Sequence, residues 1–178
     1  MRVVAGEARG RRLTARLPAH VRPTTDLVRE AVFSALVARG AVEGADVGDW
    51  YCGSGAMGIE ALSRGARRCT FVDEDRRCLD AARANLDAVG LADRDATFVR
   101  AALPAWRPAG PLDLVLCDPP YGDDVDLAAL LDGVTASLVV VESDRPLGVP
   151  EGWETPGPRR YGGTLVTMLA PTIEGVGS

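Results

Sequence analysis

The sequence has 178 residues, of which 20 are basic and 25 acidic, giving a formal net charge of −5. Hydrophobic residues make up 47% and charged residues 25%, as in ordinary globular proteins, so a disordered chain, a collagen and a coiled coil are excluded. This length predicts one domain, and the acidity argues against a general nucleic-acid coat, which would be basic.

The charges are distributed unevenly along the chain. Every basic residue is an arginine, and residues 1–29 carry a local charge of +5 while the remainder carries −10. Such asymmetry indicates a polyanion contact made by one end of the molecule. A solvated arginine-rich surface without a partner is the alternative interpretation.

The sequence predicts a cytoplasmic protein without a metal. Its start lacks the apolar core of a signal peptide, and no stretch reaches the ~18 apolar residues of a membrane span. The cysteines form no C-x-x-C pair, which makes a zinc site improbable and predicts free buried thiols in a reducing compartment. They stand at Cys52, Cys69, Cys78 and Cys117.

Strand and helix patterns alternate along the chain. A hairpin is predicted over 3–15, and a helix begins after Thr24 or Thr25 and ends at Gly40. Further helices are predicted over 56–64, 75–89 and 126–136, and strands over 46–52, 69–73, 96–100, 112–117, 138–142, 153–155 and 163–169. The alternation predicts an α/β fold with a mostly parallel sheet covered on both faces. We expect an arginine-rich arm (1–21), one domain (22–170) and a frayed tail (171–178).

A glycine loop and a distant acid predict a nucleoside pocket. The run 53–58 matches G-x-G-x-x-G, and Asp73 lies twenty residues after Gly53, at the end of the next strand. Glycines let the backbone approach a ligand, and the acid accepts hydrogen bonds from ribose hydroxyls. A dinucleotide and S-adenosylmethionine (SAM) both suit this pattern, but Asp49 at the end of the preceding strand favours an ammonium over a pyrophosphate.

The second unusual loop is Asp118-Pro119-Pro120-Tyr121, directly after an apolar strand. The prolines remove two amide donors, and Asp118 is an acceptor when ionised. A carboxylate and a bare carbonyl can accept both protons of an exocyclic amine, while Tyr121 offers a face on which a base can stack. Both loops follow carboxyl ends of strands, where ligands bind in such sheets.

Together these motifs resemble class I SAM-dependent methyltransferases that modify amino groups. The segments 22–30, 55–66 and 141–143 resemble more closely the RsmD family, which methylates guanine N2 in 16S ribosomal RNA. The resemblance implies a Rossmann-like, seven-stranded, mostly parallel sheet with an antiparallel C-terminal strand and an N-terminal β-hairpin extension. It also implies SAM as cofactor and 16S ribosomal RNA as partner, within an assembling small subunit; we expect a monomer.

The resemblance implies residue roles as well. SAM would be held by Asp49, Tyr51, Gly53, Ser54, Gly55, Asp73, Glu74, Ala101, Ala102, Asp118, Thr24 and Thr25. Asp118, Pro119, Pro120 and Tyr121 would hold the target guanine, and RNA would contact Arg9, Arg11, Arg12, Arg16, Arg22 and Tyr121. The sequence departs from many relatives after the third strand, where Ala101 and Ala102 replace an Asp or Asn that contacts adenine.

Three other functions stay open on the sequence alone. A DNA adenine-N6 methyltransferase shares the Asp-Pro-Pro-Tyr motif, and a protein glutamine methyltransferase would more often carry Asn in place of Asp118. A SAM- or nucleotide-binding module without activity is the third, and the complete motif argues against it.

Overall fold

The computed structural model describes residues 1–15, 25–120 and 125–172. The strands are β1 (Asp46–Trp50), β2 (Arg68–Asp73), β3 (Asp95–Arg100), β4 (Leu112–Cys117), β5 (Ala136–Ser143), β6 (Trp153–Glu154), β7 (Arg159–Tyr161) and β8 (Thr164–Pro171). The helices are α1 (Asp26–Ala38), α2 (Ala56–Ser63), α3 (Arg76–Ala88) and α4 (Leu127–Leu131).

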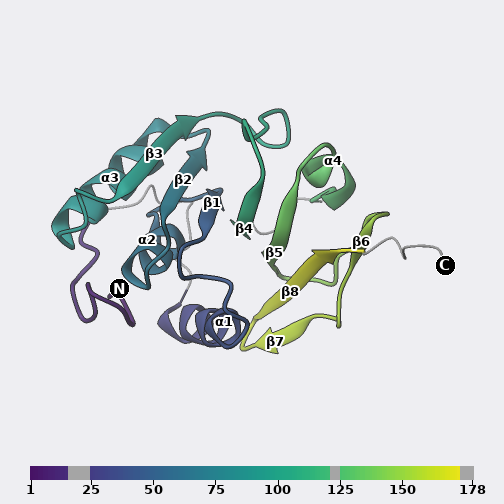
Figure 1. The fold of residues 1–178 in the computed structure, drawn as a ribbon, viewed down its shortest axis with the longest axis horizontal. Helices are drawn as coiled ribbons and strands as arrows, with labels where there is room; N and C mark the ends of the chain where they lie inside the picture. Colours follow the sequence, from purple (N-terminus) through teal and green to yellow (C-terminus); the bar gives the residue numbers. More distant parts are fainter. Residues whose placement is uncertain (16–24, 121–124, 173–178) are drawn as a thin grey trace.

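The strands form one twisted sheet in the order β3-β2-β1-β4-β5-β8-β6, with β7 also paired to β8 (Figure 1). Strands β1 to β5 pair in parallel, and β8 is antiparallel to β5, β6 and β7. The chain goes from β1 outward to β2 and β3 and then returns to β4 on the other side of β1. The junction of β1 and β4 is therefore the switch point, where ligands bind in such folds.

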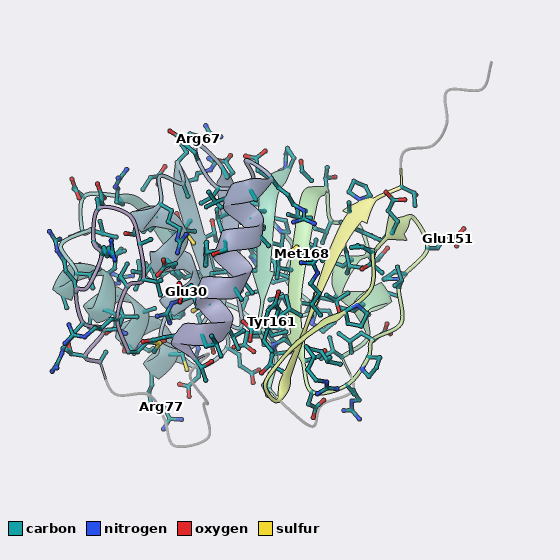
Figure 2. The ribbon with its side chains drawn as sticks, turned by 90° about the horizontal axis from the view of Figure 1, so that it is seen from below. Glu30, Arg67, Arg77, Glu151, Tyr161 and Met168 are labelled. Carbon is teal, nitrogen blue, oxygen red and sulfur yellow. The ribbon has the colours of Figure 1, made fainter. Side chains whose placement is uncertain are left out.

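Helices cover both faces of the sheet. Apolar residues of α1, α2 and α3 pack with Leu116 and Val140 on one face, while those of α4 pack with Cys117 and Val141 on the other. Figure 2 shows α1 crossing the first face, near Met168 of β8. Because side chains alternate along a strand, residues two positions beyond Leu116 and Val140 lie on the face that α1 covers.

The sequence prediction of a mostly parallel sheet with an antiparallel C-terminal strand is confirmed. Two details differ. The described residues form eight strands instead of seven, since Arg159–Tyr161 pairs with β8. The helix predicted over 126–136 was wrong in length: α4 ends at Leu131, Gly133 has a positive φ of 66°, and β5 already begins at Ala136.

The first fifteen residues dock on the helical layer. One antiparallel bridge joins Arg2 to Arg12, which makes the predicted hairpin two short extended segments without full strands. Val3, Ala8 and Leu13 are buried in the core. The backbone amides of Val4 and Ala5 donate to the Glu60 carboxylate at 2.8 and 3.0 Å, so buried groups of α2 hold this arm.

All four cysteines are free and buried, as the sequence predicts. Among the described residues, no helix has the length and apolarity needed to cross a membrane.

Candidate functional site

The candidate site lies at the carboxyl ends of β1, β2, β4 and β5. Trp50 pairs in register with Val72 of β2 and Cys117 of β4, and Cys117 pairs with Val141 of β5. The residues that follow these register partners therefore lie side by side along one edge. That edge gathers the glycine loop, Asp73, Asp118 and Glu142.

The glycine loop turns the chain sharply after β1. Tyr51, Gly53 and Gly55 have φ values of 56°, 50° and 73°, so the strand ends at Trp50, before the predicted residue 52. Left-handed backbone is easy for glycine but costs a residue such as tyrosine energy. Gly55 also packs closely on α3, because a Cβ there would lie 2.8 Å from the Ala82 Cβ.

Asp49 is a buried carboxylate of the site, at 3% exposed. Its Oδ2 accepts a hydrogen bond from the Gly58 amide at 2.9 Å. Burial raises the pKa of Asp49 well above its ordinary value, and the charges of Asp118 and Asp73 raise it further. An acid held this way is stabilised as a carboxylate when a cation lies beside it.

Asp73 links the glycine loop to the end of β2. One carboxylate oxygen accepts from the Gly53 amide at 3.0 Å, and the other accepts from the Asp75 amide at 2.9 Å. Each oxygen keeps a further lone pair, so Asp73 can still accept hydrogen bonds from a diol.

Ser54 is buried, and its carbonyl accepts from the Asn85 side-chain amide at 3.0 Å. The Asn85 carbonyl oxygen in turn accepts from the Ala15 amide at 2.8 Å. Asn85 thus joins the arm, α3 and the glycine loop. No local sequence pattern indicates a role for this residue, because both of its partners are distant in the chain.

The loop after β3 is brought to the same edge. The Ala101 amide donates to the Asp73 carbonyl at 3.1 Å, which places the half-buried Ala101 beside Asp73. Ala102 and Glu74 are exposed, and the Glu74 carbonyl accepts from the Arg100 Nε at 3.1 Å. This loop therefore lies beside Asp73 with its backbone, and neither Ala101 nor Ala102 offers a polar side chain there.

The Asp-Pro-Pro loop continues β4 at the switch point. The Asp118 amide donates to the Trp50 carbonyl at 3.3 Å. Asp118 is half-buried, Pro119 is buried and Pro120 is exposed. Asp118 therefore faces the same space as the glycine loop, whereas Tyr121 lies outside the described residues.

Glu142 of β5 is a fourth carboxyl group of this edge, and the sequence analysis did not include it in the site. It is 2% exposed, and within the described chain its Oε1 has no hydrogen-bond partner. Burial raises the pKa of Glu142 from 4.5 to about 9; the charges of Asp118 and Asp49 add to this shift, and Arg29 opposes it. Its position two residues after the buried Val140 on a sheet edge rich in acids was the available signal.

Only some of the predicted site residues at the start of α1 and in the arm lie in the described part of the chain. Thr25 caps α1 by accepting from the Val28 amide at 3.3 Å, which confirms one of the two predicted caps. Arg9, Arg11 and Arg12 are exposed, and the Arg11 Nη1 donates to the Val89 carbonyl at 2.5 Å. Arg16, Arg22 and Thr24 lie outside the described residues.

The side chains of the edge are mostly acidic and favour a cationic ligand. Asp49, Asp73, Asp118 and Glu142 meet there, and Arg29 is the one described cation whose charge acts on Glu142. A pyrophosphate would be repelled, whereas an ammonium or sulfonium would be attracted. This set of acceptors fits SAM better than a dinucleotide. Within the described ranges, no group of three or more His, Cys, Asp and Glu side chains could hold a metal ion.

This sheet order and this edge define the Rossmann-like methyltransferase fold. A solved Escherichia coli structure, titled "Putative methyltransferase yhhF", superposes with a TM-score of 0.79 at 29% identity and covers 96% of this chain and 97% of its own. Residues 1–170 match the family model described as "Conserved hypothetical protein 95". The chain belongs to this family, the RsmD family of methyltransferases.

Two curated relatives extend over most of the chain. "Putative rRNA methyltransferase YlbH" of Bacillus subtilis is 33% identical over 85% of this chain and 86% of its own length. "Ribosomal RNA small subunit methyltransferase D" of Escherichia coli K12 is 31% identical over 84% of this chain and 78% of its own length.

Proposed function

We propose that the protein transfers a methyl group from SAM to the exocyclic N2 amine of a guanine in 16S ribosomal RNA. The observation that carries this proposal is the meeting of the glycine loop, Asp49 and Asp73 with Asp118-Pro119 at the switch point. The relatives named as ribosomal RNA methyltransferases support the class of substrate.

SAM would supply a methyl group already activated by its sulfonium charge. Asp49 and the loop from Gly53 to Gly55 would hold its methionine end, and Asp73 its ribose. Tyr51, Ser54, Glu74, Ala101, Ala102, Asp118, Thr24 and Thr25 would complete the cofactor site. The protein then mainly has to position the acceptor amine.

Asp118 and the Pro119 carbonyl would accept the two N–H bonds of the guanine amine. This orients the nitrogen lone pair, which is otherwise delocalised into the ring, and raises the electron density at the nitrogen. Pro120 would stiffen the loop and Tyr121 would stack on the base. A base handled this way has to leave its stack, as in other enzymes that modify bases.

Arginines of the N-terminal segment would contact the RNA backbone; they are Arg9, Arg11, Arg12, Arg16 and Arg22. Phosphate contacts position a nucleic acid without reading its sequence. The substrate would be the assembling small subunit in the cytoplasm, and the enzyme would act as a monomer. Arg11 already has a partner in Val89, so it would contribute to RNA binding mainly through its charge.

One experiment separates the candidate substrates. The protein is incubated with radiolabelled SAM and, in parallel, undermethylated small subunits, naked 16S RNA, duplex DNA and a release factor. Label should enter small-subunit RNA, and digestion to nucleosides should yield N2-methylguanosine. Label in adenine or in protein would overturn the proposed target, and no transfer to any substrate would favour a binding module.

A further inference from the structure

Glu142 lies beside Asp118 at the end of the sheet. Their predecessors Val141 and Cys117 are register partners, and parallel strands lie about 4.8 Å apart. Val140 and Leu116 lie on the face that α1 covers. Glu142 follows Val140 by two positions and Asp118 follows Leu116 by two positions, so both lie on that face as well. Asp49 is the register partner of Leu116 and belongs to the same face. The three carboxyl groups therefore lie on the face of the sheet that α1 and α2 cover, with Asp49 beside α2.

These three carboxyl groups are poorly compensated by positive charge. Arg29 of α1 is fully buried and acts on Glu142, but of its three guanidinium nitrogens only Nη2 has hydrogen-bond partners within the described chain, and these are other groups than Glu142. Nη2 donates to Asp26 at 2.8 Å and to the Arg2 carbonyl, and Nε lies 3.5 Å from the Glu60 Oε2. Glu142 also pairs in register with the apolar Val166, and its charge acts on the Cys117 thiol, whose pKa is raised by burial.

We infer that Glu142 is a proton-exchanging residue of the cofactor site, which holds a proton in the free protein and releases it when the positively charged cofactor binds. The inference rests on the proposed function, since it needs a cationic cofactor beside Asp49 and Asp118. Nothing in the motif-based assignment of the site requires Glu142.

The physical reason is the balance of charge in a buried space. Without a ligand, a negative charge on the buried Glu142, close to Asp118 and Asp49, would be costly, so Glu142 stays neutral, in accord with its pKa of about 9. A bound sulfonium and ammonium stabilise the ionised form of every neighbouring carboxyl group. With a pKa of about 9 in the free protein, Glu142 holds a proton at pH 7 to 8 that this positive charge would displace.

After methyl transfer, Glu142 would take up a proton again. Glu142 can take the proton that the methylated amine loses once the carbon–sulfur bond has broken and sulfur has kept the electron pair as a neutral thioether. The product S-adenosylhomocysteine (SAH) has lost the sulfonium charge, so the proton on Glu142 replaces it. The total charge of the site is then the same before and after the reaction.

Calorimetric titration of the full-length protein tests this inference without measuring activity. SAM and SAH are titrated at pH 7, 8 and 9 in two buffers of different ionisation enthalpy, which gives the number of protons exchanged. Near pH 8, SAM should release up to about one proton more than SAH, and its affinity relative to SAH should rise by up to about tenfold per pH unit. The amino groups of the two ligands titrate differently, so the comparison is made against variants.

Glu142→Gln should keep only the proton difference that belongs to the ligands themselves. Glu154→Gln, an exposed glutamate of β6, is the matched control and should behave as the wild type. The inference is overturned if Glu142→Gln retains the full wild-type difference, or if Asp49→Asn alone removes it. Failure of SAM to bind the wild type would instead reject the proposed function.

Infrared difference spectroscopy gives a second measurement on the wild-type protein, in case Glu142→Gln does not fold. Adding SAM at pH 8 should remove the band of one protonated carboxyl group, whereas adding SAH should leave it. A band unchanged by SAM would reject the inference while leaving the proposed methyl transfer intact.

Discussion

At the scale of single residues, Asp118 and Glu142 are neighbouring carboxyl groups with different tasks. Asp118 is half-buried and reaches the space above the glycine loop, so it can meet a substrate. Glu142 is buried beside it, so a proton from the substrate would reach Glu142 only by way of Asp118. This difference in exposure allows the two roles to be tested separately.

Asp118→Ala should lower methyl transfer by at least about 100-fold, because it removes a preorganised acceptor for the amine. Cofactor binding measured by calorimetry should remain. Asp87→Ala, on the exposed surface of α3, is the control and should keep wild-type turnover. If Asp118→Ala turns over nearly as fast as the wild type while it still binds SAM, Asp118 is not the acceptor of the amine protons.

Glu142→Gln should flatten the dependence of stability on pH. The pKa of Glu142 is raised in the folded state from 4.5 to about 9, so between these values the folded protein holds a proton that the unfolded chain has lost. The free energy of unfolding of the wild type should therefore fall as the pH rises between these two pKa values, by up to about 1.4 kcal/mol per pH unit. Above the folded-state pKa, Glu142 should cause no further loss.

The measurement is urea unfolding of the wild type, Glu142→Gln and Glu154→Gln at pH 5, 7 and 9. The free energy of unfolding of Glu142→Gln should increase relative to that of the wild type as the pH rises. That of Glu154→Gln should change with pH as in the wild type. Parallel curves for all three proteins would mean that Glu142 is ionised in the folded state.

At the scale of elements, the tight contact between α2 and the sheet fixes Asp49. A Cβ on Gly58 would lie 2.4 Å from the Phe71 Cε1 and 2.9 Å from the Asp49 Oδ2. Helix α2 can therefore approach β1 and β2 only with glycine at this position. The same close approach brings the Gly58 amide to the Asp49 carboxylate.

Gly58→Ala should destabilise the protein by about 1–3 kcal/mol through overpacking, and it should weaken SAM binding because Asp49 is displaced. The free energy of unfolding and the dissociation constant of SAM are both measured. Gly148→Ala is the control, because a Cβ at Gly148 meets nothing within 4 Å. Wild-type stability in Gly58→Ala would show that α2 can shift without cost.

Glu60 joins three elements, and its side chain is fully buried. It accepts from Val4 and Ala5 of the arm, from the Arg64 Nε at 2.7 Å, and it lies beside Arg29 of α1. Glu60→Gln should cost about 3–5 kcal/mol, because it removes a buried negative charge beside Arg29, which then keeps only the more exposed Asp26 as an opposite charge. The arm should also become more sensitive to limited proteolysis, whereas Glu43→Gln, on the exposed surface, should change neither property. An arm as resistant as in the wild type would contradict this role.

The sequence predicted the elements that have strong local signals. The apolar run of β4, the glycine loop and the acids at strand ends are legible in a few residues, and the structure confirms their positions. The partners of Asn85, and those of Glu60 in the arm, lie 31 to 70 positions away, so no local pattern reveals these contacts. Helix α4 has five residues and strand β7 has three. Neither is long enough for the spacing of its apolar residues to define the element from the sequence.

At the scale of the whole molecule, the acids of the site and the turn of the basic arm lie at different edges of the sheet. The acids of the site gather at the carboxyl edge of the sheet. The turn of the arm instead reaches the end of α3, where Arg11 contacts Val89, at the opposite edge. An RNA that contacts both the site and the whole arm therefore has to run along the helical layer between the two edges.

This placement makes the arm testable through the salt dependence of RNA binding. Removing Arg9 and Arg12 together as R9A/R12A should weaken binding and reduce the slope of log K against log salt by about 0.7–0.9 for each phosphate that the arm no longer neutralises. R39A/R67A is the matched control, because it removes the same charge from exposed arginines after α1 and before β2 (Arg67 in Figure 2).

An unchanged slope in R9A/R12A would confine the RNA to the carboxyl edge, and the arginine-rich arm would then serve the fold through contacts such as Arg11 to Val89. A reduced slope in both double variants would instead reflect net charge alone, so the arm is an RNA surface only if R9A/R12A changes the slope more than its control does.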